Sequence, residues 1–238
     1  MSTSWIIAKK ELATYFDSLV AYVVLILFLA FTGIFTWLAG GGDVFFRKQA
    51  DLGAFFNMAY WSLFFFIPAL TMRQIAEEKK TGTIELLLTK NVSIRSIVVG
   101  KFLSCLMMVG IALLCTIPYY WTVAKLGNID HGATIAGYLG LMLMSAAYAA
   151  IGLYASSITN NQIVAFLIAL SIGIFFHFLF SFLATATPGF LGSVFDVLAL
   201  DTHYYSITRG VIDSKDLIYF FSIVVVALGA AELSIAKR

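Results

Sequence analysis

Long apolar stretches alternate with short polar segments along the whole chain. Six of the apolar stretches have the length of a membrane-spanning helix, and they lie at residues 19–39, 54–72, 102–124, 133–155, 163–186 and 217–236. A helix of about 20 apolar residues crosses the roughly 30 Å hydrocarbon core of a bilayer. The pattern therefore predicts an all-α polytopic membrane protein, with six transmembrane helices in a single domain over residues 1–238.

The composition agrees with a membrane protein and argues against nucleic-acid binding. Hydrophobic residues make up 61% of the chain and charged residues 12%, whereas soluble domains are about half apolar and about a quarter charged. The net charge is +2, and no basic run with interleaved aromatic residues occurs. Cys105 and Cys115 are ten residues apart in one predicted helix, roughly 15 Å along its axis, so they cannot form a disulfide with each other.

Two segments outside the spans are also predicted to be helical. Residues 2–17 place Trp5, Ala8 and Leu12 at helical spacing, with lysines on other faces, which is typical of an interfacial helix in the headgroup layer. The alternative is a plain cytosolic extension of the first span. Residues 189–216 are too polar to span and too apolar for an ordinary loop, which indicates a re-entrant segment or interfacial helices before the last span.

Positive charges fall unevenly between the two sides of the predicted six-span arrangement. If the N-terminus is cytoplasmic, ten lysines and arginines lie in the inner segments and five in the outer segments. Cytoplasmic loops of membrane proteins carry the excess of these residues. The chain is therefore expected to be a multi-pass protein whose N- and C-termini are both cytoplasmic.

The longest polar segment, residues 73–101, separates the second and third spans. Gly82 interrupts it, Thr83 can cap a helix, and residues 84–88 begin a short helix that is too apolar to remain uncovered in water. A docking helix for a soluble partner is one interpretation. A solvated charged face is the alternative, and acid–base catalysis by Glu77, Glu78 and Glu85 is disfavoured because lysines lie beside them at a water-facing boundary.

This segment also carries a resemblance to a known family. The sequence Glu77-x4-Gly82-Thr83-x-Glu85-Leu86-Leu87-Leu88, followed by Val92-Ser93 and Gly100-Lys101-Phe102, resembles the loop between spans two and three of ABC-2 type transporter permease subunits. The resemblance covers essentially the whole chain. Residues 203–213 further resemble the branch that contains gliding-motility and copper-enzyme-maturation permeases.

The resemblance implies a division of labour between several chains. Loop 73–101 would contain the coupling helix, and its ATPase-docking residues would be Glu77, Gly82, Thr83, Glu85, Leu86 and Leu87. The chain has no G-x-x-x-x-G-K-[ST] motif, so ATP and Mg²⁺ are expected on a partner ATPase dimer, and no cofactor or metal is expected on this chain, which is not itself an enzyme. The other implied partners are membrane lipid and a second permease subunit, identical or related to this chain. In this branch such a partner can carry a large extracytoplasmic domain. The implied location is a bacterial cytoplasmic (inner) membrane.

Three ionisable residues in or near the spans are candidates for a path or for pairing between helices. His177 lies in the middle of span five, Glu232 lies near the inner end of span six, and Arg209 lies in the re-entrant segment. Ionisable groups at membrane depth are costly and are usually functional or paired. For His177 the alternatives are a position in a path and a hydrogen-bonded structural role; for Glu232 the simpler alternative is an ion pair with a basic residue.

Two functions remain open from the sequence. The first is the transmembrane subunit of an exporter, and the second is a non-transporting anchor that relays ATPase motion to an extracytoplasmic partner. The nearly apolar spans favour a lipid-like substrate, a closed resting path or a mechanical relay. An intramembrane enzyme is disfavoured, because Ser171 and His177 are six residues apart, about 240° around a helix.

Overall fold

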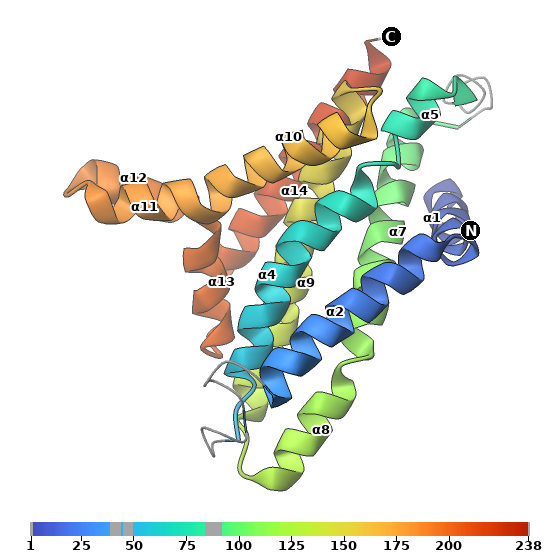
Figure 1. Ribbon diagram of the computed structural model, residues 1–238. Helices are drawn as coiled ribbons and strands as arrows, with labels where there is room; N and C mark the ends of the chain where they lie inside the picture. The colour runs from blue at the N-terminus through green and yellow to red at the C-terminus, as the bar shows by residue number, and fades with distance from the viewer. Residues whose placement is uncertain (1, 39–43, 45–49, 84–91, 238) are drawn as a thin grey trace.

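A computed structural model describes residues 2–38, 44, 50–83 and 92–237 of the chain (Figure 1). Within these residues the secondary structure is helical, and six helices are long and apolar enough to cross a membrane. They are Leu19–Trp37, Gly53–Lys80, Ile94–Leu126, His131–Ile158, Gln162–Ala186 and Ser214–Ala236. The prediction of an all-α protein with six candidate spans is confirmed.

The helical elements follow one another along the chain with short connections. Their bounds are α1 Thr3–Asp17, α2 Leu19–Trp37, α4 Gly53–Thr71, α5 Ala76–Lys80, α7 Ile94–Leu114, α8 Ile117–Leu126, α9 His131–Ile158, α10 Gln162–Ile174, the π-helical turn η1 Phe175–Leu179, α11 Phe180–Ala186, α12 Phe190–Leu198, α13 Leu200–Thr208 and α14 Ser214–Ala236. Helix α1 occupies the segment 2–17 that the sequence predicts to be helical. Its position in the headgroup layer stays a prediction.

Helix α9 is the central element of the bundle. In its apolar window 67% of the residues are buried, against 22% in α2 and 28% in α14, and it packs against α4, α7, α10, α13 and α14. Small residues permit this packing: a Cβ atom added at Gly152 would lie 2.0 Å from Thr71 Oγ1 of α4. Small residues thus let neighbouring helices approach α9 closely.

The third span differs in its limits from the predicted 102–124. Helix α7 begins at Ile94, where Ser93 Oγ accepts a hydrogen bond from Ser96 N at 3.2 Å, and it ends at Leu114. Pro118 then occupies the first turn of α8, which turns away from α7 (Figure 1). Proline cannot donate to the carbonyl four residues before it and its ring crowds that carbonyl, so the helix is interrupted at residues 115–116.

The predicted re-entrant segment 189–216 contains two short helices. Helix α10, the turn η1 and helix α11 follow one another and lead away from the bundle (Figure 1). Helix α12 then folds back along α11. The chain reverses at Gly189, whose φ of +82° favours glycine. Helix α13 then packs against α9 and α14. The depth of α12 and α13 in the membrane stays a prediction.

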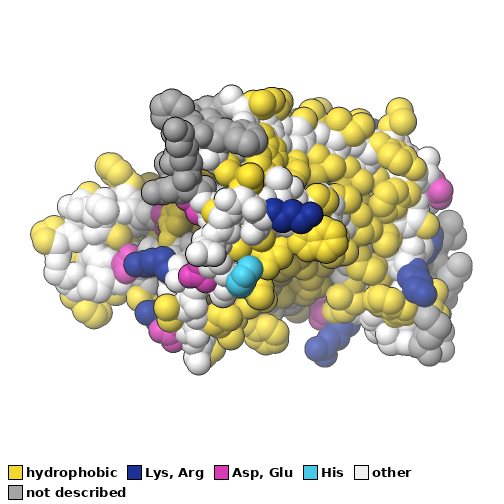
Figure 2. All heavy atoms as spheres, turned by 90° about the horizontal axis from the view of Figure 1, so that it is seen from below, with side chains coloured by type: hydrophobic (Ala, Val, Ile, Leu, Met, Phe, Trp, Pro, Cys, Tyr) yellow, Lys and Arg dark blue, Asp and Glu magenta, His cyan; other side chains and the backbone are white. Residues whose placement is uncertain are grey.

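The bundle has two different ends. At one end, named the α5 end, α5 lies with α1, the start of α7 and the last turns of α9 and α14. There Arg95 of α7 lies 4.0 Å from Glu232 of α14, and Ser234 Oγ of α14 donates to the carbonyl of Ser157 in α9. At the opposite end, named the α13 end, α13 and the start of α14 lie with α8. Figure 2 views the molecule from the α13 end and shows mostly hydrophobic side chains, with the visible lysines and arginines lying apart from one another.

Candidate functional site

Helix α5 begins where the chain turns sharply after the second span. Ser156, at the end of α9, is buried and serves this turn: its Oγ accepts from Ile75 N at 3.1 Å and from Ala76 N at 2.9 Å, and donates to Met72 O at 3.0 Å. The first N–H groups of a helix lack partners within it and need an external acceptor. A residue 80 positions away therefore fixes both the position and the direction of α5.

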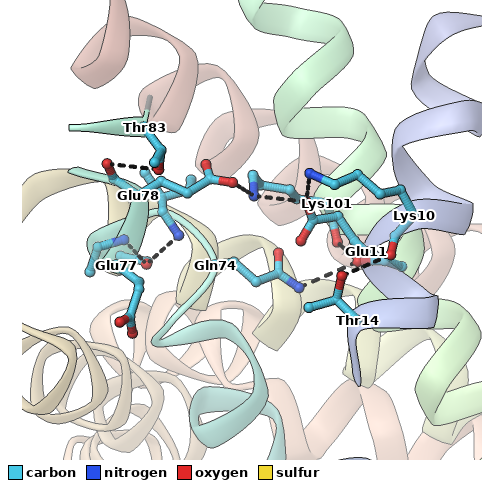
Figure 3. A network of polar contacts seen from close by, with 12 residues as sticks. Lys10, Glu11, Thr14, Gln74, Glu77, Glu78, Thr83 and Lys101 are labelled. Atoms are coloured by element: carbon cyan, nitrogen blue, oxygen red, sulfur yellow. Dashed lines mark hydrogen bonds and ion pairs between the residues drawn. The ribbon is translucent and has the colours of Figure 1, made fainter. Parts of the chain in front are cut away.

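One side of α5 is held by a buried cation. Lys101 Nζ of α7 donates to Glu78 Oε1 at 2.7 Å and lies 3.4 Å from Glu11 Oε1 of α1 (Figure 3). The Lys101 side chain is only 1% exposed. An ammonium group out of water requires such partners, because an isolated buried charge is strongly unfavourable. This triad links α1, α5 and α7.

The residues before and after Glu78 in α5 reach two other helices. The Glu77 carboxylate accepts from Gln162 Nε2 of α10 and lies 3.6 Å from Arg73 Nε, and Lys79 Nζ donates to the carbonyl of Ser157 in α9. Consecutive helical residues point about 100° apart, so Glu77, Glu78 and Lys79 reach different neighbours. Helix α5 therefore has polar contacts with α7, α9 and α10, and Lys101 links it to α1.

The predicted docking residues lie at or after this anchored helix. Gly82 has a φ of +72° with no atom within 4 Å of an added Cβ, and Thr83 is exposed with its Oγ1 3.0 Å from Thr81 Oγ1. The positive φ explains why glycine ends α5. Glu85, Leu86 and Leu87, predicted to dock on the ATPase, lie outside the described residues. The described part of the predicted site thus leads from a buried network to an exposed turn.

The three ionisable candidates of the spans lie far apart and have separate partners. His177 is 3% exposed in η1, with Nδ1 2.8 Å from the Tyr148 hydroxyl and its ring stacked on Tyr60 at 4.4 Å between centroids. Glu232 lies 4.0 Å from Arg95 at the α5 end. Arg209, exposed near the α13 end, donates from Nε to the carbonyl of residue 205 at 3.2 Å. They do not form one site, and their roles stay predictions.

Sequence reasoning missed most of the partners in this network. Ser156 lies just beyond the predicted span 133–155, but α9 continues to Ile158 and includes it. Lys101 was expected in a solvated segment, although it is buried. Neither has a local sequence signal for its partner, because the pairs are separated by 23 to 90 residues. Glu77, Gly82 and Lys101 were noted through the family resemblance, but the resemblance named none of their partners in the network.

His203 lies in the segment 189–216, which the sequence predicts to be helical. It lies in α13, where its Nδ1 is 2.6 Å from Asp216 Oδ1 of α14 and its Nε2 is 3.0 Å from the carbonyl of Val197. A carbonyl oxygen can only accept, so Nε2 of His203 carries a hydrogen and donates it to Val197. The short contact between Nδ1 and the Asp216 carboxylate is then also a hydrogen bond, with its hydrogen on one of these two groups. This buried pair joins α12, α13 and α14 at the α13 end. Its partner Asp216 lies 13 residues away in the next helix, so no local pattern in the sequence indicated the pair.

Comparison with known protein families matches residues 5–211 to the ABC-2 family transporter proteins. The matched range runs from α1 to the end of α13 and includes α5 with its anchoring residues. A comparison with curated proteins found no match. The family is built from membrane permeases whose partner is an ABC ATPase. The chain therefore belongs to the ABC-2 family of transporter proteins, as a membrane permease component of an ABC transporter.

Proposed function

We propose that a separate ABC ATPase docks at the α5 end and that its hydrolysis of ATP drives export, or work on the far side of the membrane, through this chain. The observation that carries the proposal is the anchoring of α5. One short helix, next to the exposed turn at Gly82 and Thr83, is bonded directly to α7, α9 and α10 and, through Lys101, to α1. An element that receives force from a partner must be attached to the elements that move.

The strength of this attachment supports rigid transmission. Moving α5 alone would break the Ser156 contacts, the Lys79 and Gln162 hydrogen bonds and the Lys101–Glu78 pair. At about 1 kcal/mol for a neutral hydrogen bond and more for a charged one, the total is on the order of 5 kcal/mol or more. Displacement of the docked segment would therefore carry the ends of α7 and α9 with it, as in hinge or shear motions of packed helices.

The distribution of charge supports a cytoplasmic α5 end. The described cationic residues near it are Lys9, Lys10, Arg73, Lys79, Lys80, Arg95, Lys101 and Lys237, and those near the α13 end are Lys125, Arg209 and Lys215. This excess follows the positive-inside rule. Both termini are then cytoplasmic, and the membrane is the bacterial cytoplasmic membrane.

A second permease subunit would cover part of the apolar flanks. Only 22% of the apolar windows of α2 and of α10 to α11 is buried within the chain, and 28% of that of α14. These faces contact lipid or a second subunit, identical or related. The similarity of residues 203–213 to gliding-motility and copper-enzyme-maturation permeases is not supported by the family match. It stays a prediction, as does a partner with a large extracytoplasmic domain.

Mechanical relay without transport is the alternative function. Most buried hydroxyls within the described spans donate to backbone carbonyls of their own helix, as Thr32, Thr36 and Ser145 do, and His177 contacts Tyr148. Such pairing describes a closed interior and does not distinguish a resting exporter from a relay. Reconstitution of the complete complex with substrate efflux as the readout separates the two.

The docking proposal is tested by charge reversal at the docking segment. We expect Glu85→Lys to abolish most co-purification of the ATPase and the stimulation of its hydrolysis, because a like charge or an unpaired charge in an interface costs several kcal/mol. Lys125→Glu, in α8 near the α13 end, is the matched reversal and is expected to leave both unchanged. Unchanged co-purification and hydrolysis with Glu85→Lys would remove the coupling-helix assignment.

A further inference from the structure

The pair of His203 and Asp216 at the α13 end takes no part in the anchoring of α5. His203 of α13 contacts α12 through the carbonyl of Val197, 3.0 Å from Nε2, and α14 through Asp216 Oδ1, 2.6 Å from Nδ1. The pair therefore joins three helices that follow one another along the chain (Figure 1). These helices connect the part of the chain that leads away from the bundle with the last span, so the pair decides whether this connection is held in place.

The two contacts of the imidazole fix the number of hydrogens in the pair. Both partner atoms are acceptors, a carbonyl oxygen and a carboxylate oxygen, whereas a neutral imidazole has a single N–H. Nε2 donates that hydrogen to Val197, so the hydrogen between Nδ1 and Asp216 is a second one. In water near pH 7.5 an aspartate is ionised and an imidazole is mostly neutral. Formation of the contact at this pH therefore takes up one proton.

Two neighbours favour placing this second hydrogen on the imidazole. Asp216 lies in the first turn of α14, where the helix dipole favours an ionised carboxylate. The Tyr219 ring is stacked on the imidazole with 4.0 Å between centroids, and an aromatic face attracts a cation. The Tyr219 hydroxyl donates to the carbonyl of Leu198 in α12 at 2.6 Å, which fixes the ring in this position. The pair is thus an imidazolium and a carboxylate.

Loss of the second hydrogen would leave the carboxylate without a donor. Asp216 is 0% exposed, its Oδ1 contacts His203, and its Oδ2 has no hydrogen-bond partner among the described residues. After deprotonation, the Nδ1 lone pair and the carboxylate would face each other as two acceptors. A buried charge without a partner is strongly unfavourable, so the carboxylate would have to reach water by separation of α13 from α14. The His203 side chain, 7% exposed, is the member of the pair through which the proton can reach solvent.

The remaining titratable or charged groups do not compete for this proton. Those on the elements packed against α13 and α14, outside the α5 end, are Asp196, Asp201, Tyr204, Tyr205, Arg209, Asp213, Lys215 and Tyr219, with Asp130, His131, Tyr138 and Tyr148 of α9 and His177 of η1. Among the described residues, only Tyr219 of this set contacts the pair. Asp196 and Asp201 accept hydrogen bonds from Thr202, and Lys215 lies 3.4 Å from Asp213. The pair is therefore a separate titrating unit.

We propose that His203 and Asp216 form a proton-dependent latch, which holds α12 and α13 on α14 and opens as the pH rises. The closed latch contains one proton more than the open one. Where the open imidazole is neutral and the closed pair is still protonated, the ratio of closed to open therefore falls about tenfold for each unit of rising pH. Below that range the contact is fully formed. Under the proposed orientation the latch lies on the outer side and responds to external pH, whereas its proton dependence requires neither that orientation nor ATPase docking.

The first test is thermal unfolding of the full-length chain in detergent from about pH 6 to about pH 9, for the wild type and Asp216→Asn. The asparagine amide can donate to Nδ1 of a neutral imidazole, so it keeps the contact without the extra proton. We expect the melting temperature of the wild type, relative to the variant, to fall by roughly 3–5 °C per pH unit where the proton is released, for a chain of 238 residues. The difference cancels groups that titrate in both proteins.

A second variant and a matched control complete this comparison. His203→Asn removes the titrating ring and can still donate from its amide to Asp216, so its pH dependence should match that of Asp216→Asn. The control is His131→Gln, which replaces an exposed histidine at the start of α9 whose Nδ1 lies 2.7 Å from the Tyr120 hydroxyl. It should keep the pH dependence of the wild type.

Local opening is measured without any change in the pair. Ala199, between α12 and α13, is 0% exposed, whereas Val211 is 63% exposed. In a background without native cysteines, we expect the maleimide labelling rate of Ala199→Cys, relative to that of Val211→Cys, to rise with pH by up to about tenfold per unit. The ratio removes the pH dependence of the thiol itself.

Three outcomes would overturn the proposal. A labelling ratio that does not change with pH would show that the latch does not open, even if neither variant of the pair folds. A wild-type melting temperature that keeps a constant difference from Asp216→Asn or His203→Asn would show that the pair takes up no proton. Loss of the pH dependence in His131→Gln would assign it to another histidine. None of these measurements involves the ATPase, so they stand apart from the docking test with Glu85→Lys.

Discussion

Replacement of the buried Lys101 by methionine tests whether the α5 end is held together by its charges. Methionine keeps the length of the aliphatic stem and removes the ammonium group. In the native structure that group serves two carboxylates, Glu78 at 2.7 Å and Glu11 at 3.4 Å, whose side chains are 18% and 15% exposed. After the change both carboxylates lie close to each other without a buried counter-charge, and only the exposed Lys10 remains near Glu11.

The size of the expected stability loss in Lys101→Met is set by the burial of the charges and not by the number of ion pairs. Breaking a buried pair by removal of one partner costs about 3–5 kcal/mol, because the remaining charge stays out of water. A loss of this size corresponds to roughly 6–20 °C in melting temperature for a chain of this length. Lys10 offers an internal comparison: it lies 3.9 Å from the same Glu11 but is 68% exposed, so Lys10→Gln should cost at most about 1 kcal/mol.

The assay is thermal unfolding in detergent, with the fraction of protein that stays in the monodisperse size-exclusion peak as the readout. It compares the wild type, Lys101→Met, Lys10→Gln and Lys101→Met/Glu78→Gln. The double variant replaces the orphaned carboxylate by an amide and should recover about half of the loss. Equal melting temperatures for Lys101→Met and Lys10→Gln would refute the account of a buried triad. So would a double variant less stable than Lys101→Met, since removal of the orphaned charge would then bring no benefit.

Two further predictions concern the packing and the topology. Gly152→Ala is expected to destabilise the bundle by about 1–3 kcal/mol, because the added Cβ would lie 2.0 Å from Thr71 Oγ1. Gly110→Ala, where nothing lies within 4 Å, is the control, and detergent melting compares the two. In a background without native cysteines, Thr83→Cys should react with a membrane-impermeant maleimide only from the cytoplasmic side and Lys215→Cys only from the outside. Labelling of both from one side would contradict the proposed orientation.

The six spans were predictable because they depend on local composition. A run of about 20 apolar residues has few alternatives to a helix in lipid, whatever the rest of the chain does. The interruption between α7 and α8 was only partly predictable: Pro118 marks it, but the side chains around residues 115–116 decide whether the helix bends or ends. Small residues such as Gly152 likewise indicated close packing of α9, while the identity of its neighbours required the structure.

The candidate site was less predictable because its contacts are distant in sequence. Glu77, Gly82 and Thr83 fall where a docking element was expected, next to the buried part of the α5 end, and Glu85, Leu86 and Leu87 lie outside the described residues. In the sequence, the charged residues of segment 73–101 indicated exposure to water, so Lys101 was predicted to be solvated. Whether a lysine is solvated or buried depends on carboxylates 23 and 90 residues away, which no local periodicity reveals.

The arrangement of α5 has a consequence for how motion would spread through the bundle. Glu78 is bonded to α7 and through Lys101 to α1, whereas Glu77 and Lys79 are bonded to α10 and α9. Successive helical residues point about 100° apart, so Glu77 and Lys79 face nearly opposite ways and Glu78 lies between them. A translation of α5 along its axis would move the attached helices in the same direction, whereas a rotation about its axis would pull helices on different sides in different directions. Under the proposed function, rotation of α5 by the partner ATPase would therefore rearrange the attached helices relative to one another, and translation would displace them together.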